Sequence, residues 1–142
     1  MEGLSMMITK RVNEERHFSF HSRCSCTRLT HLMFADDLLL FYGKSAHSVQ
    51  VLSSALRDFS LLSGLTAGAS KSCSIIVGSH PEYKKMVLST FGFPSGNLPI
   101  RYLGVPLIST RLTASDYIPL VERITSRIKS WTSRFVSFVG RL

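Results

Sequence analysis

Apolar side chains recur along this chain with two different periods, and each period predicts a different kind of element. Between residues 46 and 63 the apolar positions fall three and four residues apart, as on one face of an α-helix. They are Val49, Leu52, Leu56, Phe59 and Leu62. Ser45 precedes this run as a good N-cap and Gly64 follows it as a terminating glycine. The pattern therefore predicts a helix whose apolar stripe lies in the core.

Two other segments of the first hundred residues also show helical signals. Residues 1 to about 16 carry one apolar stripe, formed by Leu4, Met7, Ile8 and Val12. Pro81 stands at a plausible first helical position, and the segment it opens runs to about Phe91 before Gly92. We expect a helix in each segment.

The last predicted helix, residues 116–135, combines an apolar stripe with a basic side. Its apolar positions, in alternating steps of four and three, are Tyr117, Val121, Ile124, Ile128, Trp131 and Phe135. Asp116 is the predicted cap, which leaves Pro119 in the first turn, where its missing N–H does no harm. The side opposite the stripe is predicted to carry Arg123, Arg127, Lys129 and Arg134. No acidic residue follows Glu122.

Short apolar runs between polar residues predict the strands. In residues 30–42, two Leu- and Phe-rich segments flank Asp36 and Asp37. This arrangement predicts a β-hairpin with the carboxylates at its tip, or one long strand that is kinked there. Residues 72–77 and 102–107 predict two more short strands, and Pro106 restricts the second of them to a sheet edge.

These elements predict an α+β fold in a single domain, since the chain has 142 residues. We expect one small antiparallel sheet built on the 30–42 hairpin and joined by residues 72–77, with residues 102–107 as a further candidate strand. The helices at 46–63, 81–91 and 116–135 would cover one face. A hydrophobic content of 44% is enough for a core.

The charge balance favours a polyanionic partner. Seventeen Lys and Arg against nine Asp and Glu give a net charge of +8, and basic side chains neutralise phosphates. No apolar run reaches the roughly 20 residues that a membrane helix needs, and the N-terminus has no signal-peptide pattern, so we expect no membrane partner.

The three cysteines, Cys24, Cys26 and Cys73, are an odd number in a chain that has no secretory signal. They are interpreted as reduced thiols of a nuclear or cytoplasmic protein. His21 with Cys24 and Cys26 could suggest zinc, but structural zinc sites usually have two separated ligand pairs. A surface loop with free thiols is the favoured interpretation.

Asp36 and Asp37 are the candidate functional residues of this sequence. Burying a carboxylate costs several kcal/mol unless it is paired, and two neighbouring carboxylates repel each other. Their place inside the most apolar stretch therefore predicts a cation. Mg²⁺ fits, because it needs only one or two protein carboxylates and takes its other ligands from water and phosphates. The alternative is a solvated turn, since Asp favours turns.

The tetrapeptide Phe34-Ala35-Asp36-Asp37, with its apolar flanks, resembles motif C of reverse transcriptases, in particular those of plant non-LTR (LINE-type) retrotransposons. Further segments resemble other blocks of that family in the same order. They are Phe20-His21 with Cys24 and Leu29-Thr30-His31, Ser63-Gly64-Leu65 with Lys71-Ser72, Arg101 through Leu107, and Ile128 through Trp131 with Gly140-Arg141-Leu142. The resemblance covers nearly the whole chain.

The resemblance implies an RNA-directed DNA polymerase that works on an RNA template and a DNA primer with two Mg²⁺ ions. By resemblance, Asp36 is a direct metal ligand and Asp37 a supporting carboxylate. Phe34 and Ala35 shape the hairpin, and the small Ala35 leaves room for a primer end. Lys71 matches a family lysine that faces the phosphates of the nucleotide, although a solvated loop lysine is an equal alternative.

The same resemblance divides the chain into a palm remnant over about 1–107 and the start of a thumb over about 108–142. The expected nucleic-acid contacts are Arg101, Arg123, Arg127, Lys129 and Arg134. Gly68 departs from the family, which usually has Asn there, and this loosens the loop that carries Lys71.

The family also takes an aspartate from an upstream strand, its motif A. The only acids before Asp36 are Glu2, Glu14 and Glu15, and all are on or beside a predicted helix. We therefore expect a reverse transcriptase fragment that does not catalyse alone. A small basic nucleic-acid-binding module and an inert retroelement relic are the alternatives.

Overall fold

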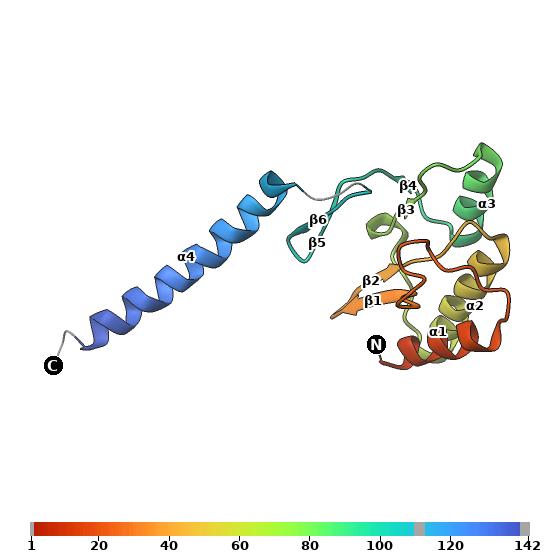
Figure 1. Ribbon diagram of the computed structural model, residues 1–142. Helices are drawn as coiled ribbons and strands as arrows, with labels where there is room; N and C mark the ends of the chain where they lie inside the picture. Colours follow the sequence, from red (N-terminus) through yellow and green to blue (C-terminus); the bar gives the residue numbers. More distant parts are fainter. Residues whose placement is uncertain (1, 110–112, 140–142) are drawn as a thin grey trace. The chain divides into compact units, whose positions relative to one another are not determined.

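The computed structural model describes residues 2–109 and 113–139, with side chains described as far as Trp131 (Figure 1). Its contacts divide the chain into two compact units, Met1–Gly96 and Asn97–Leu142. The fold is α+β, as the sequence predicts. Each unit is described by itself.

The helices of the first unit lie where the sequence predicts them. They are α1 (Glu2–Glu14), α2 (Ala46–Ser63) and α3 (Pro81–Phe91), together with a 3₁₀ turn, η1 (Ala69–Lys71). The Ser45 side chain accepts a hydrogen bond from the backbone N–H of Ser48, as an N-cap does. Gly64 ends α2 with a left-handed φ of 73°, and Pro81 opens α3.

The core of the first unit lies where α1 packs on α2. Leu4, Ile8 and Val12 of α1 are buried, as the stripe predicts, and they form one cluster with Phe18 and with Val51, Leu52 and Ala55 of α2. The prediction that Leu62 belongs to this core is wrong, because its side chain is 81% exposed. Leu61 and Leu65 beside it are also exposed, so the last turn of α2 extends past its neighbours.

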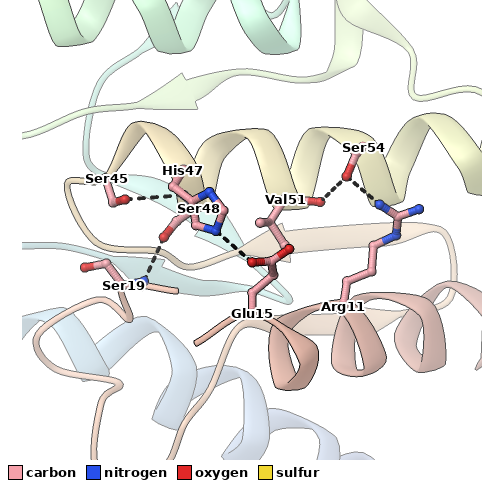
Figure 2. Close-up of polar contacts among 8 residues, drawn as sticks. All are labelled: Arg11, Glu15, Ser19, Ser45, His47, Ser48, Val51 and Ser54. Atoms are coloured by element: carbon pink, nitrogen blue, oxygen red, sulfur yellow. Dashed lines mark hydrogen bonds and ion pairs between the residues drawn. The ribbon is translucent and has the colours of Figure 1, made fainter. Parts of the chain in front are cut away.

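A row of polar contacts runs along the edge of the α1–α2 interface (Figure 2). His47 Nε2 lies 3.0 Å from Glu15 Oε2, and the Arg11 guanidinium donates to Ser54 Oγ at 2.8 Å and pairs with Asp58. These partly exposed pairs contribute little individually. Because hydrogen bonds and ion pairs are directional, they restrict the position of α1 relative to α2 more than apolar packing alone would.

The predicted hairpin is present in the first unit. β1 (His31–Phe34) pairs antiparallel with β2 (Asp37–Leu40). Because side chains alternate along a strand, the hairpin has two different faces. Its inner face includes Met33, Leu38 and Leu40, which pack against the core cluster.

The other strands correct the predicted sheet. Three separate two-stranded sheets form in the described residues, rather than one sheet built on the hairpin. β3 (Ser74–Ile75) pairs in parallel with β4 (Ser95–Gly96), so the strand near 72–77 does not join the hairpin. Its partner lies in a stretch rich in glycine and proline, residues that are typical of loops, so no periodic pattern indicates this pairing.

The segment 102–107 is not a single strand. β5 (Ile100–Tyr102) turns back into β6 (Val105–Leu107) within the second unit. Leu103 and Gly104 have φ values of 53° and 85°, as in the two-residue turns that suit hairpins. Pro106 faces Arg101 in this ribbon, where both strands are edges, so its missing N–H is tolerated.

Helix α4 (Ala114–Val139) begins earlier than predicted. Asp116 is not the first cap: its carboxylate accepts from the backbone N–H and the hydroxyl of Thr113, both at 2.7 Å. This is the reciprocal contact of a capping box, with Asp116 inside the first turn. Pro119 consequently lies inside the helix rather than in its first turn. Among the described helices, each is too short or too polar to span a bilayer.

Leu52 gives a test of the core. Leu52→Ala should lower the free energy of unfolding by about 2–5 kcal/mol, because the fully buried side chain leaves a cavity between helices. Leu62→Ala, the same change on the same helix, should alter it by less than about 0.5 kcal/mol. Urea unfolding followed by circular dichroism measures both, and equal losses would contradict this description of α2.

Candidate functional site

The two aspartates lie at the tip of the β1–β2 hairpin. Phe34 pairs with Asp37, so Ala35 and Asp36 form the two-residue turn. Ala35 has a φ of 52°, a region that residues with a Cβ seldom occupy, and one in which type II′ turns place their first central residue. Strained positions of this kind gather at functional sites, so the turn is the natural place to search for chemistry.

Both carboxylates are exposed. The expectation that they are buried in the apolar stretch is therefore wrong: Met33, Leu38 and Leu40 pack on the core, whereas the tip that carries the two carboxylates is exposed. Water can solvate both groups, so desolvation by itself does not require a cation. Their mutual repulsion remains, because they are sequence neighbours.

The outer face of the hairpin is apolar except at its tip. Strand alternation places Asp37 on the same face as Phe34, Leu32 and Leu39. Phe34 is 59% exposed and Leu32 is exposed as well. The tip therefore exposes both a charged group, the Asp37 carboxylate, and an apolar group, the Phe34 ring.

The pair of aspartates meets the requirements of Mg²⁺ only in part. Two carboxylates suffice for this ion where water and substrate phosphates complete its octahedron. In the part of the chain that the structure describes, no group of three or more His, Cys, Asp and Glu side chains could hold a metal. Asp36 and Asp37 thus form an open carboxylate pair rather than a closed cage.

A contact that the sequence analysis missed ties the hairpin to α1. Ser5 Oγ lies 2.7 Å from His31 Nε2, and Thr30 Oγ1 lies 2.9 Å from His31 Nδ1. Partial burial lowers the pKa of His31 below its ordinary value, so the imidazole is neutral at pH 7. Ser5 and His31 are 26 residues apart, and no periodic pattern or motif joins them.

The predicted phosphate contact, Lys71, lies in η1 with its side chain exposed. Its backbone N–H donates to the carbonyl of Gly68 at 3.0 Å, which closes the 3₁₀ turn. Among the described residues, no ion pair joins Lys71 to Asp36 or Asp37. The two aspartates are neighbours at the hairpin tip, whereas Lys71 lies on η1 and makes no ion pair with either of them among the described residues.

The predicted nucleic-acid contacts that can be described all belong to the second unit. Arg101 is exposed on β5, and Arg123, Arg127 and Lys129 are exposed on α4. The Arg123 guanidinium approaches the β5–β6 turn, 3.3 Å from the place where a Cβ on Gly104 would stand. The Arg134 side chain lies outside the described residues.

Residues 21–29 form a series of turns that carries two free thiols, Cys24 and Cys26. Burial, and to a lesser extent the nearby Cys26, raises the pKa of the Cys24 thiol. A protonated thiol is a poor metal ligand, because metals bind the thiolate. This region is therefore less suited to a metal than the hairpin tip.

A cavity of about 450 Å³ lies between α1 and α2, away from the aspartates. Its walls include Lys10, Arg11, Glu14 and Glu15, so charges of both signs line it. Lys10 pairs with Glu14, while Arg11 and Glu15 pair with Asp58 and His47 outside the lining. It offers no matched arrangement of nucleophile, base or metal ligands.

No protein-family model matches the chain, and no solved structure matches it.

The first test of the site concerns His31. Because folding lowers its pKa, the unfolded chain binds more protons just below pH 6.5, and stability rises with pH there. The stabilisation is complete above about pH 6.5 and is lost as the pH falls below it. Thermal melts from pH 5 to 8 should show a steeper acid-side loss for the wild type than for His31→Gln. His80→Gln, at an exposed position, is the control and should behave like the wild type.

The second test concerns the carboxylate pair. Asp37→Asn should leave the melting temperature unchanged or raise it, because it removes repulsion at an exposed tip. Mg²⁺ should raise the melting temperature little at millimolar concentration, since two carboxylates alone hold this ion weakly. A marked destabilisation on substitution, or a large Mg²⁺-dependent rise in the wild type only, would show that the chain already contains a competent metal site.

Proposed function

We propose that this chain is the motif C part of the palm, together with the start of the thumb, of a non-LTR retrotransposon reverse transcriptase. The observation that carries the proposal is the adjacent pair Asp36-Asp37 at the exposed tip of a two-residue β-hairpin turn. Nucleotidyl transfer needs carboxylates that reach the reacting phosphate from a rigid support. The inner face of the hairpin, packed on the core, provides that support.

The residues of the tip have distinct roles in this proposal. Asp36, in the turn, is the direct metal ligand, and Asp37, at the first position of β2, supports it. Ala35 has the smallest side chain that still has a Cβ, so it leaves space for a primer end above the turn. Mg²⁺, when bound, stabilises negative charge on the attacking and leaving oxygens. Lys71, exposed on η1, is the candidate phosphate contact in this proposal.

The reaction needs at least one more carboxylate than the tip supplies. Glu14 pairs with Lys10 and Glu15 with His47, so the acids at the end of α1 have other partners. Among the described residues no third carboxylate joins the pair, so we expect no primer extension by this chain alone.

A chimera tests the proposal directly. Residues 1–142 would replace the corresponding segment of an active non-LTR reverse transcriptase, and primer extension on an RNA template would be measured with Mg²⁺. We expect extension to be retained. Asp36→Asn should reduce it by more than about 100-fold and Asp37→Asn by about 10–100-fold, since the first removes a ligand and the second its support.

Two controls belong to this experiment. Glu82→Gln, an exposed carboxylate on α3, should leave extension by the chimera unchanged. A chimera that folds but extends no primer, or one in which Asp36→Asn stays active, would contradict the proposal.

The charge of the second unit favours a second candidate function, nucleic-acid binding without catalysis. Residues 97–142 contain seven Lys and Arg but two acids, a net charge of +5. Phosphate contacts make the logarithm of affinity fall linearly with the logarithm of the salt concentration. Each basic side chain that contacts a phosphate contributes about one to that slope.

A salt titration tests this binding function. The wild type should bind an RNA–DNA duplex at low salt, and Arg101→Gln or Arg123→Gln should each lower the slope by about one. Lys84→Gln, on α3 of the first unit, should leave the slope unchanged. Failure of the wild type to bind either duplex or single strands at low salt would exclude this function.

A further inference from the structure

Ser5 of α1 and His31, the first residue of β1, lie in contact within the first unit. Ser5 Oγ is 2.7 Å from His31 Nε2, and the other ring nitrogen, Nδ1, is 2.9 Å from Thr30 Oγ1. A hydroxyl next to an imidazole that a third polar group orients is the arrangement in which a base activates a nucleophile. All three groups are already within hydrogen-bonding distance.

The hydroxyl of Thr30 orients the imidazole ring. In the tautomer with its proton on Nδ1, the ring donates to Thr30 Oγ1, and Nε2 accepts from the Ser5 hydroxyl. Burial holds the pKa of His31 below its ordinary value, so the ring is neutral and can accept a proton at pH 7. Thr30 itself is buried, so packing fixes its position. His31 therefore has the role of a base, and Thr30 is a positioning residue.

Both reacting groups can be reached from solvent. Ser5 and His31 are only partly buried, Gly3 is exposed, and Met6 beside Ser5 is 73% exposed. A small molecule can therefore approach the Ser5 hydroxyl without any opening of the core.

The start of α1 supplies donors for negative charge that develops beside Ser5. Ser5 lies in the first turn of α1, and helical side chains lean toward the N-terminus of their helix. The opening N–H groups of a helix have no acceptor within it and carry partial positive charge. In α1 they include the N–H groups of Gly3 and Leu4. Such groups can stabilise the oxyanion of an acyl transfer.

The strength of the base restricts the class of substrate. No carboxylate forms an ion pair with His31 among the described residues, and its lowered pKa makes it a weaker base than an ordinary histidine. The exposed Glu2 carboxylate, in the same turn as Ser5, also opposes negative charge on a substrate. Such a pair suits an ester with a good leaving group rather than an amide, whose amine must be protonated as it departs.

We propose that Ser5 is a nucleophile, activated by His31, for acyl transfer from small, reactive carboxylic esters. Ser5 Oγ forms a bond to the acyl carbon while its proton passes to His31 Nε2, and the alcohol leaves with that proton. Water then adds to the acyl-serine, again with His31 as the base. This step releases a carboxylic acid and restores the Ser5 hydroxyl. The activity depends on neither the two aspartates nor the polymerase assignment.

A fluorophosphonate reagent tests the nucleophile, because an activated serine oxygen displaces its fluoride and stays labelled. The full chain would be labelled at pH 7, and mass spectrometry would locate the label. We expect it on Ser5, and Ser5→Ala, which keeps a good helix former, should abolish it. Ser89→Ala is the matched control, at an exposed serine of α3 whose hydroxyl donates to the Met86 carbonyl, and it should label like the wild type. Hydrolysis of p-nitrophenyl acetate should rank the variants in the same order.

The pH profile of labelling tests the base. The rate for the wild type should rise as His31 loses its proton, with a midpoint below about pH 6.5, and level off by pH 7. His31→Gln should slow labelling by about 100-fold and remove this rise. Thr30→Val, of nearly the same shape, should lower the plateau about tenfold but keep the rise, since the base remains with a less well-defined orientation. Circular dichroism would establish that each variant is folded.

Three results would overturn this proposal. One is a folded wild type whose Ser5 is labelled no faster than Ser89. Another is a labelling rate that does not change between pH 5 and 7, a measurement that needs no substitution at His31. The third is hydrolysis of the ester at the same rate by Ser5→Ala and the wild type, since another group would then be the nucleophile.

Discussion

The packing of α1 on α2 is the interaction on which the first unit depends. Ile8 and Leu52, one from each helix, are fully buried in the same cluster, and the inner face of the hairpin packs against it. Each fully buried side chain of this size stabilises the fold by about 1.5–3 kcal/mol relative to an exposed one. The hairpin alone has four residues in each strand, too few to be stable in water. Its existence therefore follows from the helices beneath it.

This dependence explains the position of the two aspartates. The core holds Met33, Leu38 and Leu40, so the strands are fixed near their middle and the turn extends beyond the packed region. The positive φ of Ala35 can persist there because the register of the two strands determines the turn. Ser5 and His31 add a directional contact between α1 and the first residue of β1. The hairpin thus has a base that is packed on the core and an exposed, charged tip.

The second unit is built differently. Its long helix has an apolar stripe as regular as the one on α2, but no described core receives it. The same physical preference, removal of apolar surface from water, thus stabilises the first unit internally and leaves the second with an unsatisfied surface.

The sequence by itself determined what local signals encode. Ser45 and Gly64 mark the ends of α2, Pro81 and Gly92 mark those of α3, and the apolar runs around Asp36-Asp37 predict the hairpin, because caps and periodicity act within a few residues.

Tertiary structure alone decided which strands pair, since β3 meets β4 and β5 meets β6 through contacts that no local pattern specifies. It also decided that Leu62 is exposed, although it belongs to the same stripe as the buried Leu52, because burial depends on where a neighbouring helix ends. The exposure of Asp36 and Asp37 and the contact of His31 with Ser5 have the same cause. Local sequence determines the conformation of a residue, whereas segments far away in the sequence form its surroundings.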